Sequence, residues 1–170
     1  MSLDRESAAT DRVQVLSRSP AQTRGLGERL GALMQKGDVV ALVGPLGAGK
    51  TTLVQGMAEG LGSTGRVRSP SFTLVNEYPT PRGKLYHLDL FRLEHSGEAE
   101  EAGLGEFLPG DGMAVVEWAD RAADLLPSEH LEIAVEMGSQ EEERLLLLTA
   151  RGKRYRLLLA ALANGGRGPC

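Results

Sequence analysis

The sequence predicts a single α/β domain built around a central, mostly parallel sheet that carries helices on both faces. Three observations lead to this fold class. Short apolar runs typical of buried strands alternate with segments of helical periodicity. A glycine-rich segment, residues 44–51, joins one such strand directly to a helix. The length of 170 residues suits one domain, and no repeat or low-complexity linker divides it.

The first half of the chain alternates strands and helices. Residues 13–16 form a short apolar run that predicts a strand, and residues 38–43 predict a second, buried strand. Between them, apolar side chains recur at helical spacing over residues 21–34. A second helix is expected over residues 51–61, where a Gly-Leu-Gly sequence is a natural stop.

The second half begins with further strands. Residues 72–75 predict a strand after a loop, and residues 85–91 predict the next one. Residues 97–108 are acidic and broken by glycine, which favours short helices. Residues 113–117 form a continuous apolar run that ends in an acid, and they predict a buried strand.

An antiparallel hairpin is expected near the C-terminus. It comprises residues 131–137 and 144–149, and we expect it on the surface, apart from the glycine-rich segment. Residues 154–163 fit either a last strand or a helix.

The composition, 41% hydrophobic and 25% charged, is ordinary for a soluble globular protein. We expect the folded domain to span residues 12–163, with residues 1–11 disordered and residues 164–170 a loose tail. The only cysteine, Cys170, permits no internal disulfide, which suits a reducing cytosol.

Charge and hydropathy exclude several classes of partner. The net charge of −4 gives no support for broad electrostatic binding to nucleic acid, so no DNA partner is expected. No apolar run approaches the roughly 18 residues of a membrane span. Residues 1–11 lack the apolar core of a signal peptide. We therefore expect a cytoplasmic protein.

The segment Gly44–Thr51 matches the phosphate-binding pattern G-x-x-x-x-G-K-[ST] at every fixed position. Glycines let the backbone curl so that successive N–H groups point inward as an anion cradle. The start of the following helix adds unpaired N–H groups and partial positive charge. The sequence thus predicts a P-loop NTPase-like domain. The nucleotide contacts expected from this loop are Gly44, Leu46, Gly47, Ala48, Gly49, Lys50, Thr51 and Thr52.

Side chains within and beyond the loop suggest the chemistry. Lys50 supplies a mobile positive charge for the outer phosphates, and the Thr51 hydroxyl can bind Mg²⁺. A nucleotide with Mg²⁺ also needs an acid at the end of a neighbouring strand. Glu117 and Asp89 both fit, so one can hold the metal while the other orients the attacking water.

Other polar segments carry weaker signals. Residues 66–73 fit either a switch loop that senses the γ-phosphate or an ordinary connection. His87 is more typical of a core histidine than of a ligand, and residues 141–143 fit a solvated turn. Trp118 fits either an anchor for a partner or ligand, or core packing. No Asn-Lys-x-Asp run supports recognition of guanine.

Three function classes are compatible with the loop and the acids, and the absence of a guanine motif does not by itself establish ATP as the nucleotide. The first class is an enzyme that hydrolyses a bound nucleoside triphosphate. A small-molecule or nucleoside kinase would need an acceptor pocket and an arginine-rich lid, and no segment has the character of such a lid. A nucleotide-gated interaction module with negligible turnover is the third. The product separates the first two, because a kinase leaves a phosphorylated acceptor rather than inorganic phosphate.

Several segments together, in order and spacing, resemble the bacterial TsaE family, formerly YjeE. The resemblance covers roughly residues 21–148 and is far more specific than the loop alone. The segments are Thr23 with Leu26-Gly27-Glu28-Arg29-Leu30, Gly37-Asp38, Leu46-Gly47-Ala48-Gly49-Lys50-Thr51-Thr52, Ser69-Pro70-Ser71-Phe72-Thr73-Leu74, His87-Leu88-Asp89-Leu90-Phe91-Arg92-Leu93, Glu117-Trp118 and Leu126-Pro127.

The resemblance implies a small ATPase of the pathway that makes threonylcarbamoyladenosine in tRNA. Such a protein binds ATP and Mg²⁺ and acts with the TsaD and TsaB subunits, meeting tRNA only through that complex. By the same resemblance, Thr51 and Glu117 would hold the metal, Asp89 would serve the hydrolytic water, and Thr23 would lie near the adenine. Docking onto TsaD and TsaB is expected through residues 69–73 and the region around Trp118.

This chain departs from the family pattern at three positions. Pro45 stands where the family usually has an acid, and Ser71 stands where threonine is common. Phe91 replaces the usual tyrosine and removes a hydroxyl. If that hydroxyl makes a needed contact, the activity is altered.

Overall fold

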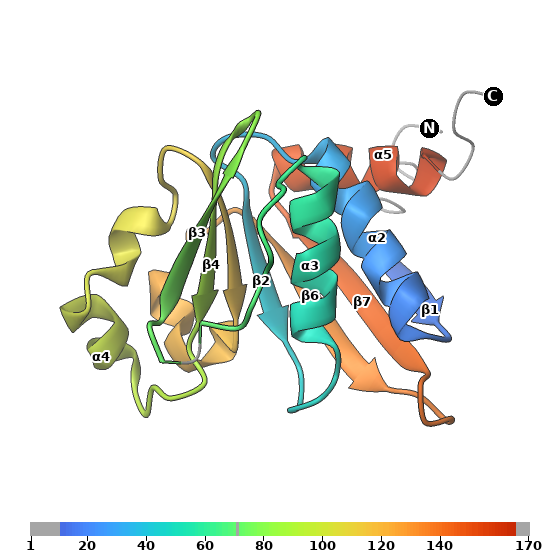
Figure 1. Ribbon diagram of the computed structural model, residues 1–170, viewed down its shortest axis with the longest axis horizontal. Coiled ribbons are helices and arrows are strands. Elements are labelled where there is room, and N and C mark those ends of the chain that lie inside the picture. The colour runs from blue at the N-terminus through green and yellow to red at the C-terminus, as the bar shows by residue number, and fades with distance from the viewer. Residues whose placement is uncertain (1–10, 71, 166–170) are drawn as a thin grey trace, which may run out of the picture.

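The computed structural model describes residues 11–70 and 72–165, and these form one α/β domain on a seven-stranded sheet (Figure 1). The strand order is β1-β7-β6-β2-β5-β4-β3. The strands are β1 Arg12–Ser17, β2 Val39–Val43, β3 Val75–Thr80, β4 Gly83–Asp89, β5 Met113–Glu117, β6 His130–Met137 and β7 Arg144–Arg151. The predicted fold class is confirmed.

The centre of the sheet is parallel and its borders are antiparallel. Strands β6, β2, β5 and β4 run in the same direction, while β3, β7 and β1 pair antiparallel with their neighbours. The register places Glu117 beside both Leu42 and Asp89. Because the carboxyl ends of parallel strands meet at one edge, β2, β4 and β5 all end where the glycine-rich loop begins.

Helices cover both faces of the sheet. Helices α2 (Pro20–Leu33), α3 (Lys50–Gly60) and α5 (Lys153–Asn164) pack on one face, where their apolar side chains form the larger core cluster. A smaller cluster on the other face includes side chains from α4 (Ser96–Glu101) and from two 3₁₀ helices, η1 (Leu104–Phe107) and η2 (Ala119–Leu125). Side chains of β2 and β5 alternate between the two clusters, as the pleat requires.

Helices α2 and α3 lie side by side (Figure 1), and glycines at their contact let the two backbones come close. A Cβ atom on Gly31 would lie 2.1 Å from the carbonyl oxygen of Met57, and one on Gly56 would lie 2.0 Å from that of Arg24. Gly27 and Gly60 are equally confined. This close contact fixes α3, whose first residue is the lysine of the phosphate-binding motif.

Two sequence predictions of element position were wrong. The strand expected at residues 72–75 begins at Val75 instead, because Leu74 has a φ of 69° and lies in a turn in which its N–H donates to the carbonyl of Pro70. The C-terminal hairpin is antiparallel as expected, but it is not apart from the loop. Strand β6 pairs in parallel with β2, in the middle of the sheet.

The C-terminal segment is a helix, α5, and η2 was not expected at all. The predicted disorder of residues 1–11 and the predicted loose tail fall largely outside the described residues. Within them, the carbonyl of Asp11 accepts a hydrogen bond from Ala150, and α5 extends to Asn164. Across the described ranges, no helix is both long and apolar enough to cross a membrane.

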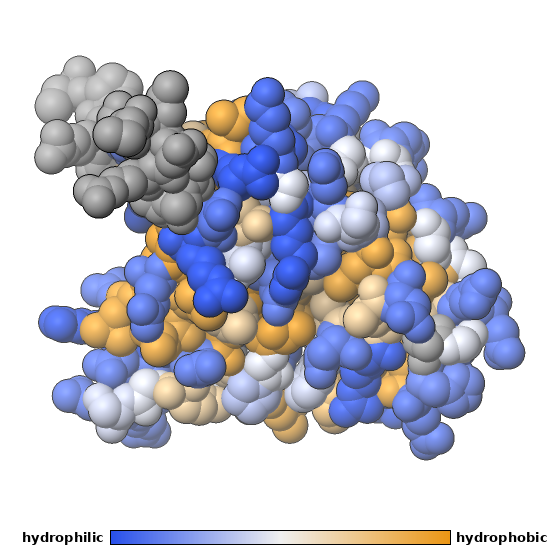
Figure 2. Space-filling model, turned by 180° about the vertical axis from the view of Figure 1, so that it is seen from behind, coloured by the Kyte–Doolittle hydropathy of each residue, from blue (hydrophilic) through white to orange (hydrophobic). Residues whose placement is uncertain are grey.

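Large apolar side chains that remain exposed are few among the described residues. Among them are Leu46, in the glycine-rich loop, and Phe72, in the segment before β3, which are 72% and 84% exposed. Seen from behind, apolar surface is broken up by hydrophilic side chains (Figure 2).

Candidate functional site

The glycine-rich loop connects β2 to α3 and takes a conformation that only glycine adopts without strain. Gly44, Gly47 and Gly49 have φ angles of 150°, 79° and 97°. A Cβ atom on Gly44 would also lie 2.5 Å from the carbonyl oxygen of Val135 on β6. The loop therefore curls tightly against the sheet, as a backbone cradle for an anion must.

Lys50 begins α3, and its ammonium group lies against the loop. Its Nζ donates hydrogen bonds to the carbonyl oxygens of Gly44 at 2.6 Å and Pro45 at 2.9 Å. The same atom lies 3.9 Å from the centroid of the Trp118 ring. Burial lowers the pKa of Lys50 from its ordinary value, while the carboxylates of Glu117 and Asp89 act in the opposite direction. A partly desolvated cation is thus held at the loop.

Glu117 ends β5, and its carboxylate is the meeting point of two elements. The Thr51 hydroxyl of α3 lies 3.1 Å from both carboxylate oxygens. On the other side, Nε2 of His87 lies 2.5 Å from Oε2 of Glu117. His87 is fully buried on β4, so the imidazole supports the carboxylate from beneath. Its role was missed in the sequence because nothing in its own segment points to β5.

Asp89 ends β4, next to Glu117 in the register of the sheet. Its carboxylate accepts a hydrogen bond from the Ser69 hydroxyl at 2.7 Å and one from the backbone N–H of Phe91 at 2.9 Å. The side chain is buried, so these donors fix its orientation. Ser69 belongs to the segment predicted as a switch loop, and this hydrogen bond ties that segment to the predicted water-orienting acid.

A single cleft of about 410 Å³ brings the predicted catalytic and metal-binding residues together. It is lined by Leu46, Gly47, Ala48, Gly49, Lys50, Thr51, Thr52, Ser69, Asp89, Phe91, Glu117 and Trp118. Trp118, with a φ of 57°, turns its ring onto Phe91 at a centroid distance of 5.1 Å. Ser71, one of the departures from the family pattern, lies outside the described residues.

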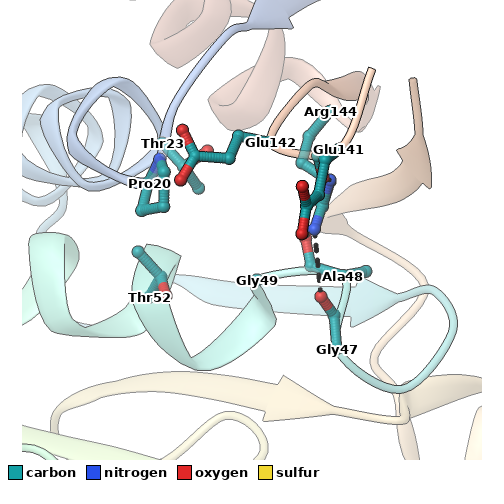
Figure 3. A pocket seen from close by; sticks show the side chains of 9 residues that line it. All are labelled: Pro20, Thr23, Gly47, Ala48, Gly49, Thr52, Glu141, Glu142 and Arg144. Carbon is teal, nitrogen blue, oxygen red and sulfur yellow. Dashed lines mark hydrogen bonds between the residues drawn. The ribbon is translucent and has the colours of Figure 1, made fainter. Parts of the chain in front are cut away.

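A second cavity, of about 280 Å³, adjoins the loop on its other side (Figure 3). It is lined by Pro20, Thr23, Gly47, Ala48, Gly49, Thr52, Glu141, Glu142 and Arg144. The predicted base contact, Thr23, is buried here, and its hydroxyl lies 2.7 Å from that of Ser17. The structure thus places Thr23 beside the loop, with Thr52 on the facing helix.

The turn between β6 and β7 forms the far wall of this cavity. Figure 3 shows Glu142 extending from the turn toward Thr23, while Arg144 reaches Gly47. Residues 141–143 were expected to be only a solvated turn, and that interpretation is incomplete because two of them line the cavity. The sequence could not show this, since the turn lies more than 90 positions from the loop it approaches.

Comparisons with known proteins agree with this geometry. A family model described as "Threonylcarbamoyl adenosine biosynthesis protein TsaE" matches residues 17–146. The chain is similar to the "tRNA threonylcarbamoyladenosine biosynthesis protein TsaE" of Bacillus subtilis, at 41% identity over 86% of this chain and 90% of that protein. The protein of the same name from Haemophilus influenzae is 35% identical over 76% of this chain and 81% of its own.

A solved structure shows the same fold. The crystal structure of Bacillus subtilis YdiB superposes with a TM-score of 0.78 at 35% identity, covering 92% of this chain and 97% of that one. From the family model, the curated relatives and the shared fold, we conclude that the chain belongs to the TsaE family.

Proposed function

We propose that the chain binds ATP with Mg²⁺ and hydrolyses ATP as an accessory subunit in the formation of threonylcarbamoyladenosine in tRNA, acting with TsaD and TsaB. The observation that carries the proposal is the convergence of a loop lysine, a loop threonine and two buried carboxylates on one cleft. The pathway comes from the relatives, which are named tRNA threonylcarbamoyladenosine biosynthesis proteins.

The loop and Lys50 would bind the phosphates of ATP. The Lys50 ammonium currently donates to two neutral carbonyl oxygens. Phosphate oxygens are better acceptors, because charge-assisted hydrogen bonds are roughly twice as strong as neutral ones. Burial leaves the charge of Lys50 poorly solvated and so lowers its pKa, and an anionic ligand would replace part of the lost solvation. The cavity beside Thr23 would then take the nucleoside.

Thr51 and Glu117 would hold Mg²⁺. Their oxygens already lie 3.1 Å apart, and both are hard ligands of the kind that this cation prefers. A bound Mg²⁺ would neutralise charge that develops on the phosphates. His87 holds the Glu117 carboxylate in place from the core side, so the acid needs little reorganisation.

Asp89 would orient the attacking water. Asp89 ends β4 beside Glu117 and lines the cleft at the loop, and an ionised carboxylate accepts hydrogen bonds from water. The water oxygen bonds to the γ-phosphorus while the bond to the β–γ bridging oxygen breaks, which gives ADP and inorganic phosphate. Asp89 holds the water for attack and Lys50 stabilises the charge that develops.

Phosphate release tests this function. The purified chain is assayed with ATP and Mg²⁺, first alone and then with TsaD, TsaB and tRNA. We expect slow release by the chain alone and faster release with the complete set. Phosphorylated acceptor in place of inorganic phosphate would indicate a kinase instead. No release under either condition would contradict the proposal.

A further inference from the structure

Arg144, the first residue of β7, connects the hairpin turn to the phosphate-binding loop. Its Nε donates to the carbonyl oxygen of Ala48 at 3.1 Å, and its Nη2 lies 3.4 Å from that of Gly47. Its Nη1 donates to the carbonyl oxygens of Glu141 at 2.7 Å and Glu143 at 2.8 Å. Within the part of the chain that the structure describes, the hydrogen bonds of the guanidinium thus all go to backbone oxygens of the turn and of the loop.

The contact with Ala48 controls the direction of an amide in the loop. A trans peptide is planar, so its C=O and N–H groups point in opposite directions. When the Ala48 carbonyl is held toward Arg144, the N–H of Gly49 is held away from Arg144. Gly49 caps the N-terminus of α3 with a φ of 97°, a position where N–H groups bind phosphate.

The loop needs a contact that fixes its backbone, because its own sequence permits several backbone conformations. Gly47 and Gly49 flank Ala48, and glycine populates many backbone conformations. A peptide that rotated would present its carbonyl oxygen to an anionic ligand in place of its N–H. The rigid, planar fork of arginine suits the task, because it carries several donors in fixed directions.

We propose that Arg144 is a positioning residue for phosphate binding, which holds the Ala48–Gly49 peptide so that its N–H faces the ligand. This inference rests on the proposed nucleotide-binding function. Arg144 acts through the backbone of the loop, since Nε, Nη1 and Nη2 are all engaged with carbonyl oxygens. It also links the hairpin turn, which lines the nucleoside cavity, to the conformation of the phosphate site.

The test compares Arg144→Met, Arg144→Lys and a matched control, Arg151→Met. Arg151 lies on the same strand and forms a half-exposed ion pair with Glu132. Binding of ATP and of inorganic tripolyphosphate is measured by displacement of a fluorescent ATP analogue. Arg144→Met loses two charge-assisted hydrogen bonds to the loop, so its affinity for both ligands should fall about ten-fold. Arg144→Lys keeps the positive charge but loses the planar set of guanidinium donors, so we expect its affinity for both ligands to fall as well.

Two further readouts separate positioning from a general structural role. The KM for ATP should rise while kcat changes little, because the ground-state contacts of the phosphates are lost. In ¹H–¹⁵N spectra of the ligand-free chain, the Gly49 amide should shift in Arg144→Met and not in Arg151→Met. Both variants should keep a cooperative thermal transition.

Several results would overturn the inference. Tripolyphosphate affinity equal to that of the wild type in a folded Arg144→Met chain is one, and full affinity in Arg144→Lys is another, since charge alone would then suffice. An unmoved Gly49 amide would also contradict it. If the wild-type chain itself binds no nucleotide, the proposed function fails instead, and the amide shift still decides whether Arg144 holds the loop.

Discussion

Glu117 is the residue on which the cleft depends most. Its buried carboxylate contacts the Thr51 hydroxyl on α3 and the His87 imidazole on β4, so three elements meet at one group. A buried carboxylate is costly unless it is fully hydrogen-bonded or paired. Asp89, two residues beyond His87 on the same strand, accepts hydrogen bonds from the Ser69 hydroxyl and from the backbone N–H of Phe91. These donors differ from the Thr51 and His87 contacts of Glu117, and we expect the two acids to serve different steps.

The acids should give different phenotypes when they are substituted. Glu117→Ala should weaken Mg²⁺-dependent ATP binding, because it removes a ligand that acts in the ground state. Asp89→Asn should leave binding nearly intact and slow hydrolysis, because it removes a group needed in the transition state. Nucleotide titrations and single-turnover hydrolysis check both, with Asp124→Asn on the exposed side of η2 as the control. The reverse pattern would exchange the two roles.

His87 offers a test of the support beneath Glu117. His87→Leu fills the same buried position with an apolar side chain but removes the partner of the Glu117 carboxylate. The increase in ATP affinity that Mg²⁺ produces should therefore fall about ten-fold or more. Binding without Mg²⁺ should change little. Isothermal titration with and without the cation measures the difference, and the exposed His95→Gln serves as control. An unchanged Mg²⁺ effect would assign His87 to core packing alone.

At this scale, the motif residues could be predicted, because the loop pattern and the strand-end acids are local in sequence. Arg144 and His87 could not be assigned. Arg144 contacts a carbonyl 96 positions away, and His87 contacts a carboxylate 30 positions away. Their roles depend on strand order, which no local pattern encodes.

Among the elements, the contact between α2 and α3 positions the site most directly. Both helices carry glycines at their interface, and the backbone of each blocks a Cβ on the other. The periodic apolar residues predicted α2 correctly, within one residue at each end. The position predicted for the hairpin was wrong because the parallel pairing of β6 with β2 joins segments far apart in the sequence. The sequence pattern of an antiparallel pair is the same whether the pair lies at the border or in the centre of a sheet.

Two glycine substitutions within α2 should have opposite effects on stability. Gly31→Ala places a Cβ against the Met57 backbone, which cannot move aside easily, so the free energy of unfolding should fall by about 1–3 kcal/mol or more. Gly25→Ala meets nothing within 4 Å, so it should raise stability by about 0.5–1 kcal/mol through helix propensity. Urea unfolding checks both. Equal effects would contradict the close helix contact.

For the molecule as a whole, charge and surface point toward protein partners rather than a direct hold on tRNA. The net charge is −4, and phosphate neutralisation needs clustered cations. Exposed Phe72, with the Arg92 guanidinium 4.1 Å from its ring centroid, lies on the loop that also holds Ser69. A nucleotide that changes the Ser69–Asp89 contact would therefore change this surface too.

Docking onto TsaD and TsaB should follow the nucleotide state. ATP should strengthen association more than ADP, because only a ligand with different affinities for two loop states can shift them. Light scattering with purified subunits in ATP, in ADP and without nucleotide measures the effect. Equal association under the three conditions would contradict the hypothesis that residues 66–73 act as a nucleotide-dependent switch. The absence of association would remove the proposed partners.

The measurement that tests the central claim most directly is isothermal titration of the chain with ATP and Mg²⁺, comparing the wild type with Lys50→Ala. The exposed Lys84→Ala, which loses a surface ion pair with Glu77, is the control. We predict that Lys50→Ala lowers ATP affinity about ten- to a hundred-fold, since hydrogen bonds to charged groups contribute roughly 1.5–3 kcal/mol, while Lys84→Ala binds as the wild type does. Unchanged ATP affinity in Lys50→Ala, with unchanged turnover, would contradict the assignment of this cleft as the site of ATP.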